Sequence, residues 1–486
     1  MITLTIQPQL SKIFQLFKDK LIGNSFWAIL SSVFQNIIFS LFFIVIARRY
    51  DATDFSSYII ANTLYGLIMS FSSLGLSQWF IREIKQSDFQ TETISRFFKI
   101  QLFAGILFYL VNVALSFTLY NSELVRNISL LLGVNIIFDN IIYVFKTINI
   151  SRYQQKRNFA FSSVEAFIKL LLAAVVVYID LDILSVIALL VSLRITTLLL
   201  FFRYGLSDKT SFMIFINGPL HLMEIGRMLK KNIYFVVIGS VSVVYWSTGS
   251  LLVSKMLNFG QVADYEISFK LFSMAEIIPV MVSASVFPLL VDKGKSDLQE
   301  RNQFFRKVFL AYAIYGLLAF TFIYSYASLL IPSLFGEQYA HTASYCIQMF
   351  LTIVVFPTAL LQANVLVAIH MEKTDMWLNL SSLVLNIFIA FVGLMFFKNL
   401  SVVNYAIFIS FLFFHVAQDI ILVKHGISKQ SESLFFYVSS AFLLLAYHFI
   451  APFFSSYYFF FLFWIFFGTC ILIYRKTFIR TVSVTG

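Results

Sequence analysis

The sequence predicts an all-α polytopic membrane protein with about fourteen transmembrane helices. Hydrophobic residues make up 59 % of its 486 residues and charged residues only 12 %, whereas soluble domains carry about 25 % charged residues. The mean hydropathy is +0.85. The apolar residues form long runs, and Lys and Arg are concentrated in alternate connecting segments. This composition excludes a cytosolic enzyme, a secreted disulfide-linked protein and a nucleic-acid-binding domain.

Apolar runs of at least about 18 residues are long enough to cross a bilayer as helices. Six are expected before residue 205, at Leu21–Ala47, Phe55–Ile81, Ile100–Leu119, Val125–Phe145, Ala160–Ile179 and Ile183–Phe202. Six more are expected afterwards, at Asn232–Ser254, Val262–Val291, Val308–Leu330, His341–Ile369, Met376–Phe397 and Leu400–Val423. The run Ser433–Tyr474 contains no Asp, Glu, Lys or Arg, and its length allows two further spans with a turn near Pro452–Ser456.

Two amphipathic segments outside these spans are expected to lie on the membrane surface. In Leu10–Lys20 the apolar residues share one helical face and Lys12 and Lys18 lie off it, as in an interfacial helix. Pro219–Lys231 has a similar pattern and begins with Pro, which suits the first helical position. We therefore expect an N-lobe at residues 1–204, a cytoplasmic amphipathic connector at 205–231, a C-lobe at 232–424 and a final helix pair at 425–486.

The distribution of Lys and Arg predicts that both termini are cytoplasmic. In that orientation, 27 of the 35 Lys and Arg residues lie in cytoplasmic segments, five lie in outer loops and three lie inside spans. Cytoplasmic loops of membrane proteins carry this kind of basic excess. The net charge of +11 therefore reflects topology in a bacterial cytoplasmic membrane, and no nucleic-acid partner is expected.

A short internal repeat links the two halves of the chain. Phe55-Ser-Ser-Tyr58 and Val262-Ala-Asp-Tyr265 lie 207 residues apart, and each is at the start of a long span that follows an outer loop. With six spans per copy, both copies have the same orientation in the membrane. Parallel repeats of this kind occur in transporters, where the substrate site lies at the repeat interface.

Several motifs in both halves resemble those of Wzx-type polysaccharide repeat-unit flippases. In the first half they are Ile46-Ala-Arg-Arg-Tyr-Asp-Ala-Thr-Asp-Phe-Ser-Ser-Tyr58 and Leu74-Gly-Leu-Ser-Gln-Trp-Phe-Ile-Arg-Glu-Ile84. In the second half they are Asp264-Tyr265, Val286-Phe-Pro-Leu289 and Leu334-Phe-Gly-Glu-Gln-Tyr339. Such flippases belong to the multidrug/oligosaccharidyl-lipid/polysaccharide (MOP) exporter superfamily, which also includes the MATE-like exporters.

The resemblance implies two six-helix lobes and two extra C-terminal helices, with a central cavity open alternately to each side. It implies transport of an undecaprenyl-diphosphate-linked oligosaccharide for O-antigen, lipopolysaccharide, capsule or exopolysaccharide synthesis, without enzymatic activity. Expected partners are this lipid-linked oligosaccharide, membrane lipids and the polysaccharide polymerase with its chain-length machinery. No cofactor or metal is expected, apart from coupling to H⁺ or Na⁺.

One difference in sequence from related flippases reduces the number of possible substrates. Relatives that flip the peptidoglycan precursor carry an Arg-Asp pair late in the first span, whereas this chain has Phe39-Ser-Leu-Phe-Phe-Ile-Val45. The resemblance therefore argues against the peptidoglycan precursor as the substrate.

Ionisable residues inside spans are functional candidates, because each costs at least about 2.5–3.5 kcal/mol to insert. Glu266 and Lys270 lie one helical turn apart on the eighth span. Lys270 is a candidate for binding a substrate phosphate or an acidic sugar, and the alternative is an ion pair that neutralises itself. Glu276 lies deeper in the same span with no cation one turn away, so it is a candidate for ion coupling.

Asp139 on the fourth span is a second candidate for ion coupling, and pairing with Lys146 or Lys169 is the alternative. The pair Glu165 and Lys169 on the fifth span is expected to be structural.

Further candidates lie near the ends and polar faces of spans. Arg48 and Arg49 lie at the outer mouth between the first two spans, where they would bind an anionic headgroup or anchor the helix end. Gln35 and Asn36 form part of a polar stripe on the first span, which would line a wet cavity or bond to a neighbouring helix. We expect the charged groups of Arg194 and Asp419 to extend toward the cytoplasmic interface.

Two other functions remain open at this stage. A cation-coupled multidrug exporter of the same superfamily would need a net negative cavity, whereas the candidates here include Lys270 and the Arg48–Arg49 pair. A membrane-embedded polysaccharide polymerase or glycosyltransferase would need a long outer loop with catalytic residues, and no expected outer loop is long enough.

We predict that reporter fusions after Lys231 and after Lys476 are cytoplasmic and that a fusion near Ser455 is external. The physical reason is the excess of basic residues on one side of the expected spans. Alkaline phosphatase and fluorescent-protein fusions measure the two locations. An external C-terminus would mean that Ser433–Tyr474 crosses the membrane once.

Overall fold

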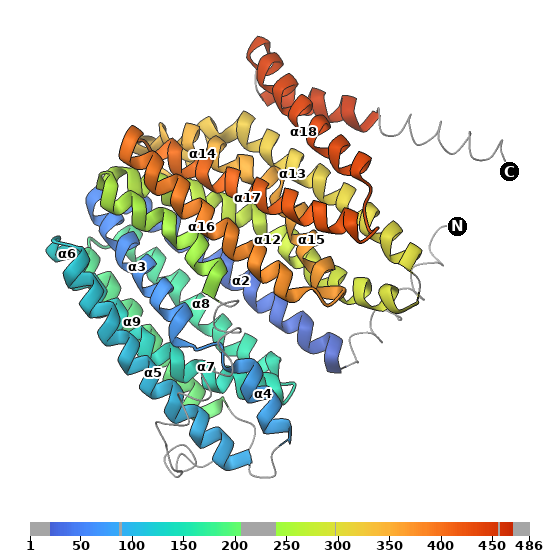
Figure 1. The fold of residues 1–486 in the computed structure, drawn as a ribbon. Helices are drawn as coiled ribbons and strands as arrows, with labels where there is room; N and C mark the ends of the chain where they lie inside the picture. The colour runs from blue at the N-terminus through green and yellow to red at the C-terminus, as the bar shows by residue number, and fades with distance from the viewer. Residues whose placement is uncertain (1–19, 87–89, 206–239, 297, 455–456, 470–486) are drawn as a thin grey trace, which may run out of the picture. The chain divides into compact units, whose positions relative to one another are not determined.

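The computed structural model describes residues 20–86, 90–205, 240–296, 298–454 and 457–469 (Figure 1). Nearly all of these residues are helical, and none of them is in a strand. Ten of the described helical segments are long and apolar enough to cross a membrane. The predicted fold class, an all-α polytopic membrane protein, is confirmed. The expected surface helices Leu10–Lys20 and Pro219–Lys231 lie outside the described residues, apart from Lys20.

The first half of the chain forms eight described helices in place of the six expected spans. They are α2 (Lys20–Arg49), α3 (Ala52–Ser72), α4 (Ser77–Gln86), α5 (Gln90–Leu119), α6 (Glu123–Gly133), α7 (Asn135–Ser151), α8 (Gln155–Tyr178) and α9 (Ile183–Tyr204). Two expected spans are therefore divided. Phe55–Ile81 breaks between α3 and α4, and Val125–Phe145 breaks at Val134 between α6 and α7.

The break between α3 and α4 has a local cause in the backbone. Leu74 and Gly75 have φ angles of 55° and 57°, which end a right-handed helix, and Gly adopts this conformation without steric cost. The amide of Ser77, which begins α4, donates to the Tyr143 hydroxyl at 3.1 Å. That bond satisfies one of the amides that a helix N-terminus leaves without an intrahelical acceptor.

Side-chain caps begin three helices that follow expected outer loops. Asp51 accepts hydrogen bonds from the amides of Thr53 and Asp54 at the start of α3, and Ser122 accepts from the Val125 amide at the start of α6. Asp182 caps α9, where hydrogen bonds from the Ser185 hydroxyl and amide lower the pKa of its carboxyl group. Each cap replaces an acceptor that the helix itself cannot supply.

The second half follows the expected spans with one interruption. Residues 240–256 are helical and are followed by α12 (Phe259–Ser296), α13 (Leu298–Phe335), α14 (Thr342–Phe350), α15 (Phe356–Ala368), α16 (Glu372–Phe397), α17 (Leu400–Lys424), α18 (Gln430–Ile450) and a helix at Tyr457–Thr469. The expected span His341–Ile369 is divided by the 3₁₀ turn η2 (Leu351–Val354). The turn η3 (Ala451–Phe453) confirms the expected break after α18.

Contacts divide the chain into two units. The first comprises Met1–Glu266 and Ala390–Leu400, and the second comprises Ile267–Ile389 and Ser401–Gly486. The first unit reaches beyond the expected N-lobe because hydrogen bonds tie its helices to the start of the second half. The Ser56 hydroxyl donates to the Phe259 carbonyl at 2.5 Å, and the hydroxyl groups of Tyr120 and Ser254 lie 2.7 Å apart. The expected division into lobes stays a prediction.

The starts of α3 and α12 agree with the internal repeat. Ala52 and Phe259, the first residues of these helices, are separated by the same 207 residues as the two short motifs. The helices then differ, because α3 ends at Ser72 whereas α12 continues for 38 residues. The repeat therefore sets where the helix begins but not how it ends.

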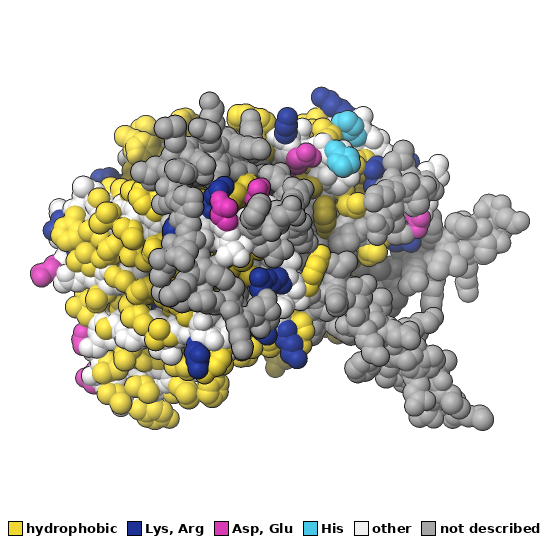
Figure 2. All heavy atoms as spheres, turned by 90° about the horizontal axis from the view of Figure 1, so that it is seen from below, with side chains coloured by type: hydrophobic (Ala, Val, Ile, Leu, Met, Phe, Trp, Pro, Cys, Tyr) yellow, Lys and Arg dark blue, Asp and Glu magenta, His cyan; other side chains and the backbone are white. Residues whose placement is uncertain are grey.

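Many large hydrophobic side chains are exposed, as expected for helices whose solvent is lipid. Examples are Leu199 at 60 % exposure, Phe388 at 63 % and Phe442 at 69 %. Figure 2 shows wide areas of hydrophobic side chains on the face in view, with small separate groups of charged ones. The buried polar residues, in contrast, lie within the helical units.

Gly316 allows α13 to lie directly against the backbone of η2. A Cβ atom at this position would lie 2.6 Å from the carbonyl oxygen of Ile353 and 3.0 Å from that of Val354. These are backbone atoms, which cannot turn aside as the end of a flexible side chain can. Small residues permit such close approach between helices in membranes.

We predict that Gly316→Ala destabilises the protein by about 1–3 kcal/mol, the usual cost of overpacking. The matched control is Gly66→Ala on α3, where nothing lies within 4 Å of the added Cβ and Ala is the better helix former. Thermal unfolding in detergent, followed by fluorescence-detected size-exclusion chromatography, compares the two variants. Equal melting temperatures would show that α13 and η2 are not packed in this way.

Candidate functional site

A cluster of charged side chains lies inside the first unit. Arg194 of α9 binds both oxygens of the Glu165 carboxylate of α8, at 2.7 and 2.6 Å. The same guanidinium forms an ion pair with Asp139 of α7, which also accepts a hydrogen bond from the Tyr65 hydroxyl of α3. The Asp139 side chain is only 5 % exposed and that of Glu165 only 12 %. Four helices are thus joined through one guanidinium.

This cluster corrects the sequence-based expectation for Arg194. It also gives Asp139 a partner other than Lys146 and Lys169, the two that the sequence analysis named. Arg194 does not extend to the cytoplasmic interface, because two buried carboxylates hold it inside the unit. Asp139 is paired, as its alternative interpretation required, but with Arg194 rather than with Lys146 or Lys169. The sequence shows that consecutive spans each contain a charged residue. The spacing of residues along one helix, however, does not predict contacts between residues on three separate helices.

Two lysines lie near this cluster. Lys169 of α8 is 9 % exposed, and its Nζ lies 3.7 Å from the centroid of the Phe39 ring of α2. Lys146 of α7 is half-buried. Both ammonium groups interact electrostatically with Asp139, Glu165 and Arg194. The direct partner of Glu165 is therefore the Arg194 guanidinium rather than the expected Lys169.

The polar candidates on α2 and at its outer end have different surroundings. Gln35 donates to the carbonyl and the hydroxyl of Ser31, at 3.0 and 2.8 Å, while Asn36 is exposed. Arg49 forms an ion pair of 2.5 Å with Asp180 in the loop between α8 and α9. Arg48 is exposed at the same helix end. The Arg49 pair is open to solvent, so it contributes at most about 1 kcal/mol and can exchange for another anion.

Glu266 and Lys270 occupy successive turns of α12, and both are half-buried. The Ser250 hydroxyl, from the helix at residues 240–256, donates to the Glu266 carboxylate. Glu266 therefore has a hydrogen-bond partner on another helix. Lys270 remains a candidate for binding an anionic part of a substrate.

Glu276 lies about two turns beyond Lys270 along α12, close to Pro279 of the same helix. Its Oε2 is buried and has no hydrogen-bond partner among the described residues. Pro279 lacks an amide hydrogen, which leaves the Ala275 carbonyl without its helical donor. The Tyr315 hydroxyl of α13 donates to that carbonyl at 2.6 Å, and the Tyr312 hydroxyl donates to the Pro279 carbonyl at 3.0 Å. Two tyrosines thus fix the segment that carries Glu276.

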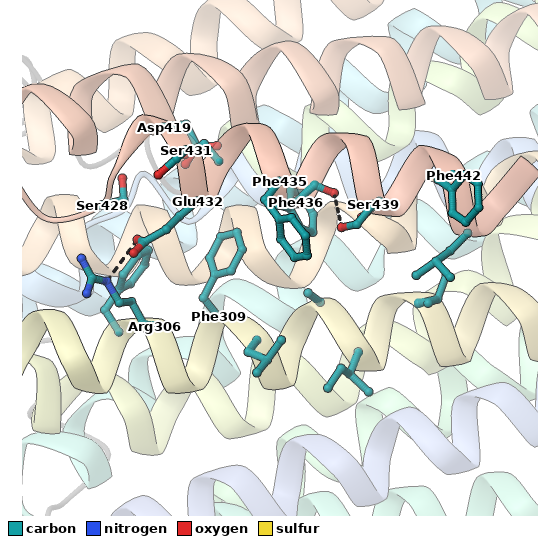
Figure 3. A pocket seen from close by; sticks show the side chains of 18 of the residues that line it. Arg306, Phe309, Asp419, Ser428, Ser431, Glu432, Phe435, Phe436, Ser439 and Phe442 are labelled. Atoms are coloured by element: carbon teal, nitrogen blue, oxygen red, sulfur yellow. Dashed lines mark hydrogen bonds and ion pairs between the residues drawn. The ribbon is translucent and has the colours of Figure 1, made fainter. Parts of the chain in front are cut away.

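A cavity of about 770 Å³ lies in the second unit between α13 and α18 (Figure 3). Its walls are mainly apolar and aromatic, with Phe309 from α13 and Phe436 and Phe442 from α18. In Figure 3 the charged groups gather at one end, where Arg306 and Glu432 form an ion pair of 3.1 Å. The cavity therefore combines a long apolar wall with a charged end.

A buried polar network borders this cavity. Asp419 of α17 lines the cavity, is 4 % exposed and accepts hydrogen bonds from Gln362 at 2.7 Å and from the Tyr437 hydroxyl at 2.6 Å. His415, one turn earlier, lies 2.6 Å from Tyr437 and 2.9 Å from Thr358. Asp419 therefore does not extend to the interface as expected. Sequence reasoning missed His415 altogether, because its partners lie on separate helices.

No group of three or more His, Cys, Asp or Glu side chains in the described part of the chain could hold a metal ion. The charged clusters above are therefore built from ion pairs and hydrogen bonds between side chains.

Comparison with known proteins identifies the family. Residues 45–344 match the model of a family described as "Polysaccharide biosynthesis protein". The chain belongs to this family. The comparison with curated protein sequences gives no match.

Solved structures confirm the transporter fold. The chain is similar to the lipid II flippase MurJ in an inward closed conformation, with a TM-score of 0.70 and 12 % identity, covering 93 % of this chain and 98 % of that one. It is also similar to an inward-facing multidrug resistance MATE transporter of the MOP superfamily, with a TM-score of 0.65, 12 % identity and coverage of 82 % and 96 %. For the MATE multidrug transporter DinF-BH the values are 0.59, 14 %, 84 % and 95 %. This polysaccharide biosynthesis protein therefore has the fold of the MOP superfamily, as the motifs predicted.

We predict that Arg194→Met destabilises the protein by about 3–5 kcal/mol, because it leaves two buried carboxylates without their cation. Arg194→Lys keeps the charge but loses the two parallel hydrogen bonds, so its loss should be smaller. The matched control is Arg203→Met in the last turn of the same helix, where the side chain is exposed. Unfolding in detergent measures the order, and a wild-type melting temperature for Arg194→Met would contradict the cluster.

Proposed function

We propose that this protein translocates an undecaprenyl-diphosphate-linked oligosaccharide from the inner to the outer leaflet of the bacterial cytoplasmic membrane. The observation that carries the proposal is the family match over residues 45–344 in a chain with a MOP-type transporter fold. Polysaccharide assembly combined with a membrane transport fold requires a step that moves sugars across the bilayer. No bond is made or broken in that step.

The chemistry of the second unit supports a lipid-linked substrate. The cavity between α13 and α18 has an apolar wall and a charged end, which suits a molecule with a hydrocarbon chain and a polar head. One of the structural neighbours is described as a lipid II flippase.

In this proposal five of the candidate residues have a role. Lys270 binds an anionic part of the substrate, and Glu266 positions it from the preceding turn of α12. Arg48 and Arg49 receive the headgroup at the outer mouth, where the exposed pair of Arg49 with Asp180 can open. Glu276 is the candidate for coupling to H⁺ or Na⁺, because its buried oxygen has no hydrogen-bond partner among the described residues.

The remaining expectations concern the cellular setting. Both termini face the cytoplasm, and the lobes at residues 1–204 and 232–424 open a central cavity alternately to each side, as the resemblance to Wzx-type flippases implies. The product serves O-antigen, capsule or exopolysaccharide synthesis through the polysaccharide polymerase and its chain-length machinery. These assignments rest on the basic residues of the sequence and on the resemblance to Wzx-type flippases.

The proposal predicts accelerated flipping of a fluorescent oligosaccharide linked to a short polyprenyl diphosphate in proteoliposomes. Lectin accessibility at the outer surface measures the rate. Lys270→Ala should lower it at least about tenfold, since an ionic hydrogen bond contributes about 1.5–3 kcal/mol, and Lys270→Arg should keep part of it. Transport of a cationic dye with no flipping of the lipid would favour the multidrug exporter instead.

A double variant separates binding from folding in this experiment. Removing Lys270 alone leaves the negative charge of Glu266 with less neutralisation in a poorly solvated place, which could destabilise the fold. The double variant Glu266→Gln with Lys270→Ala removes this negative charge as well. A substrate-binding lysine predicts that the double variant remains inactive at normal abundance, whereas recovery would mean that Lys270 only pairs with Glu266.

A further inference from the structure

A row of hydrogen-bonding groups joins three helices of the second unit around His415. Asp419 Oδ2 lies 2.6 Å from the Tyr437 hydroxyl oxygen, and that oxygen lies 2.6 Å from Nδ1 of His415. On the other side of the ring, Nε2 lies 2.9 Å from the Thr358 hydroxyl oxygen, which lies 2.9 Å from the Val355 carbonyl oxygen. All four distances are those of hydrogen bonds. We refer to these five groups as the His415 chain.

The four contacts need more hydrogen atoms than the chain carries when Asp419 is ionised and His415 is neutral. Each contact needs one hydrogen between its two heavy atoms. A tyrosine hydroxyl, a threonine hydroxyl and a neutral imidazole carry one each, whereas a carboxylate and a carbonyl carry none. Three hydrogens are thus present for four contacts. One additional proton, on either His415 or Asp419, completes the chain.

The chain can also release this proton without movement of its heavy atoms. The Thr358 hydroxyl then turns from the Val355 carbonyl to Nε2 of His415, and Nδ1 keeps the ring hydrogen for Tyr437. The Val355 carbonyl retains a donor, because the Ala359 amide lies 2.9 Å from it. The carboxylate keeps its hydrogen bond from the tyrosine. Every member of the chain therefore has a partner in both states, so neither state leaves a buried group unsatisfied within the chain.

The chain is buried but reaches the cavity at one end. His415 and Thr358 are 0 % exposed, whereas Asp419, at 4 % exposure, lines the cavity between α13 and α18. Figure 3 shows Asp419 toward the charged end of that cavity. A proton can thus enter the chain through Asp419. Without the proton the chain carries one buried negative charge, which is costly, and with the proton it is neutral.

The charged groups on the surrounding helices have partners of their own. Arg306 of α13 and Glu432 of α18 form an ion pair with each other at 3.1 Å. Asp375 of α16 accepts a hydrogen bond from a glutamine of α17 at 3.2 Å. Against the imidazole itself lie aromatic rings of α13 and α18, at centroid distances of 6.1 and 5.2 Å, and the hydroxyl group from α15. The added proton therefore belongs to His415 and Asp419, whose Nδ1 and Oδ2 lie 3.6 Å apart and which titrate as a pair.

We propose that the His415 chain, in the wall of the cavity, is a binding site for a single exchangeable proton. The site is separate from Glu276, to which the proposed function assigns ion coupling. Because Tyr437 belongs to α18, the bound proton completes the hydrogen bonds that join this helix to α17 and α15. Loss of the proton leaves a negative charge at the cavity, so the charge that a ligand meets there depends on pH.

The test determines whether Nε2 of His415 carries hydrogen, by nitrogen NMR of the full-length protein in nanodiscs with isotopically labelled histidine. His415→Gln assigns the signals. Nε2 carries hydrogen in the proton-bound state, whether the proton is on the imidazole or on the carboxylate, and is bare in the empty state. We expect wild-type Nε2 to change from protonated to bare between about pH 5.5 and about pH 8.5, a range around the usual histidine transition.

Two variants should fix Nε2 in opposite states. Thr358→Val removes two contacts but only one hydrogen, so the chain is complete without an added proton and Nε2 should be bare across the range. In Asp419→Asn the side-chain amide donates the missing hydrogen to Tyr437, so Nε2 should be protonated across the range. A network with a merely structural role predicts lower stability in both variants but not these opposite states.

His448 is the matched control within the same spectra. Its Nδ1 lies 2.8 Å from the Tyr324 hydroxyl, but the residue is exposed. It should therefore titrate alike in the wild type and in both variants, which also shows that the variants are folded around α18.

Two results would overturn the proposal. Wild-type Nε2 in one unchanged state across the pH range would exclude an exchangeable proton. The same state of Nε2 in Thr358→Val and Asp419→Asn would contradict the count of hydrogens. Because the measurement needs no substrate, its outcome is independent of the proposed flippase function, which the lectin assay tests separately.

Discussion

The interior of the first unit depends on the guanidinium of Arg194. It neutralises the charges of two carboxylates inside a helical bundle whose outer surface faces lipid. An uncompensated charge in such surroundings is costly, so Asp139 and Glu165 require a cation. Because these residues come from α7, α8 and α9, their pairing fixes how the three helices lie. Tyr65 extends the cluster to α3. Lys169 lies near this cluster, with its ammonium group against the Phe39 ring of α2.

In the second unit, a buried carboxylate is stabilised by hydrogen bonds from uncharged side chains. Asp419 is held by Gln362 and Tyr437, and His415 lies between Tyr437 and Thr358. Tyr437 belongs to α18, so this network docks that helix beside α17 and closes one side of the cavity along α13. At the other end of α18 the hydroxyl groups of Tyr447 and Ser325 lie 2.5 Å apart. The cavity wall is therefore held at both ends by polar contacts, while its middle is apolar.

The proposed substrate has a hydrocarbon chain and a hydrated sugar, and the described residues include apolar and polar surfaces in separate places. The cavity beside α18 is apolar with one charged end, whereas Lys270 lies on α12 and the amides of Gln35 and Asn36 lie on α2. The helix α12 carries Glu266 and Lys270 on successive turns and Glu276 about two turns later, and two tyrosines of α13 donate hydrogen bonds to the carbonyls of Ala275 and Pro279. These groups are thus placed by one continuous helix whose weak point is supported from α13.

The sequence by itself determined the fold class, most helix positions and the break after α18, because apolar run length and basic-residue asymmetry are local properties of the chain. The motifs also led to the fold shared with MOP transporters. It did not determine the breaks at Leu74–Gly75 and Val134, which lie inside continuous apolar runs. Nor did it determine the partners of Arg194, Asp419 and His415. Helical periodicity reports which residues share a face of one helix, whereas these charges are satisfied across three or four helices, and only the tertiary structure decides which faces meet.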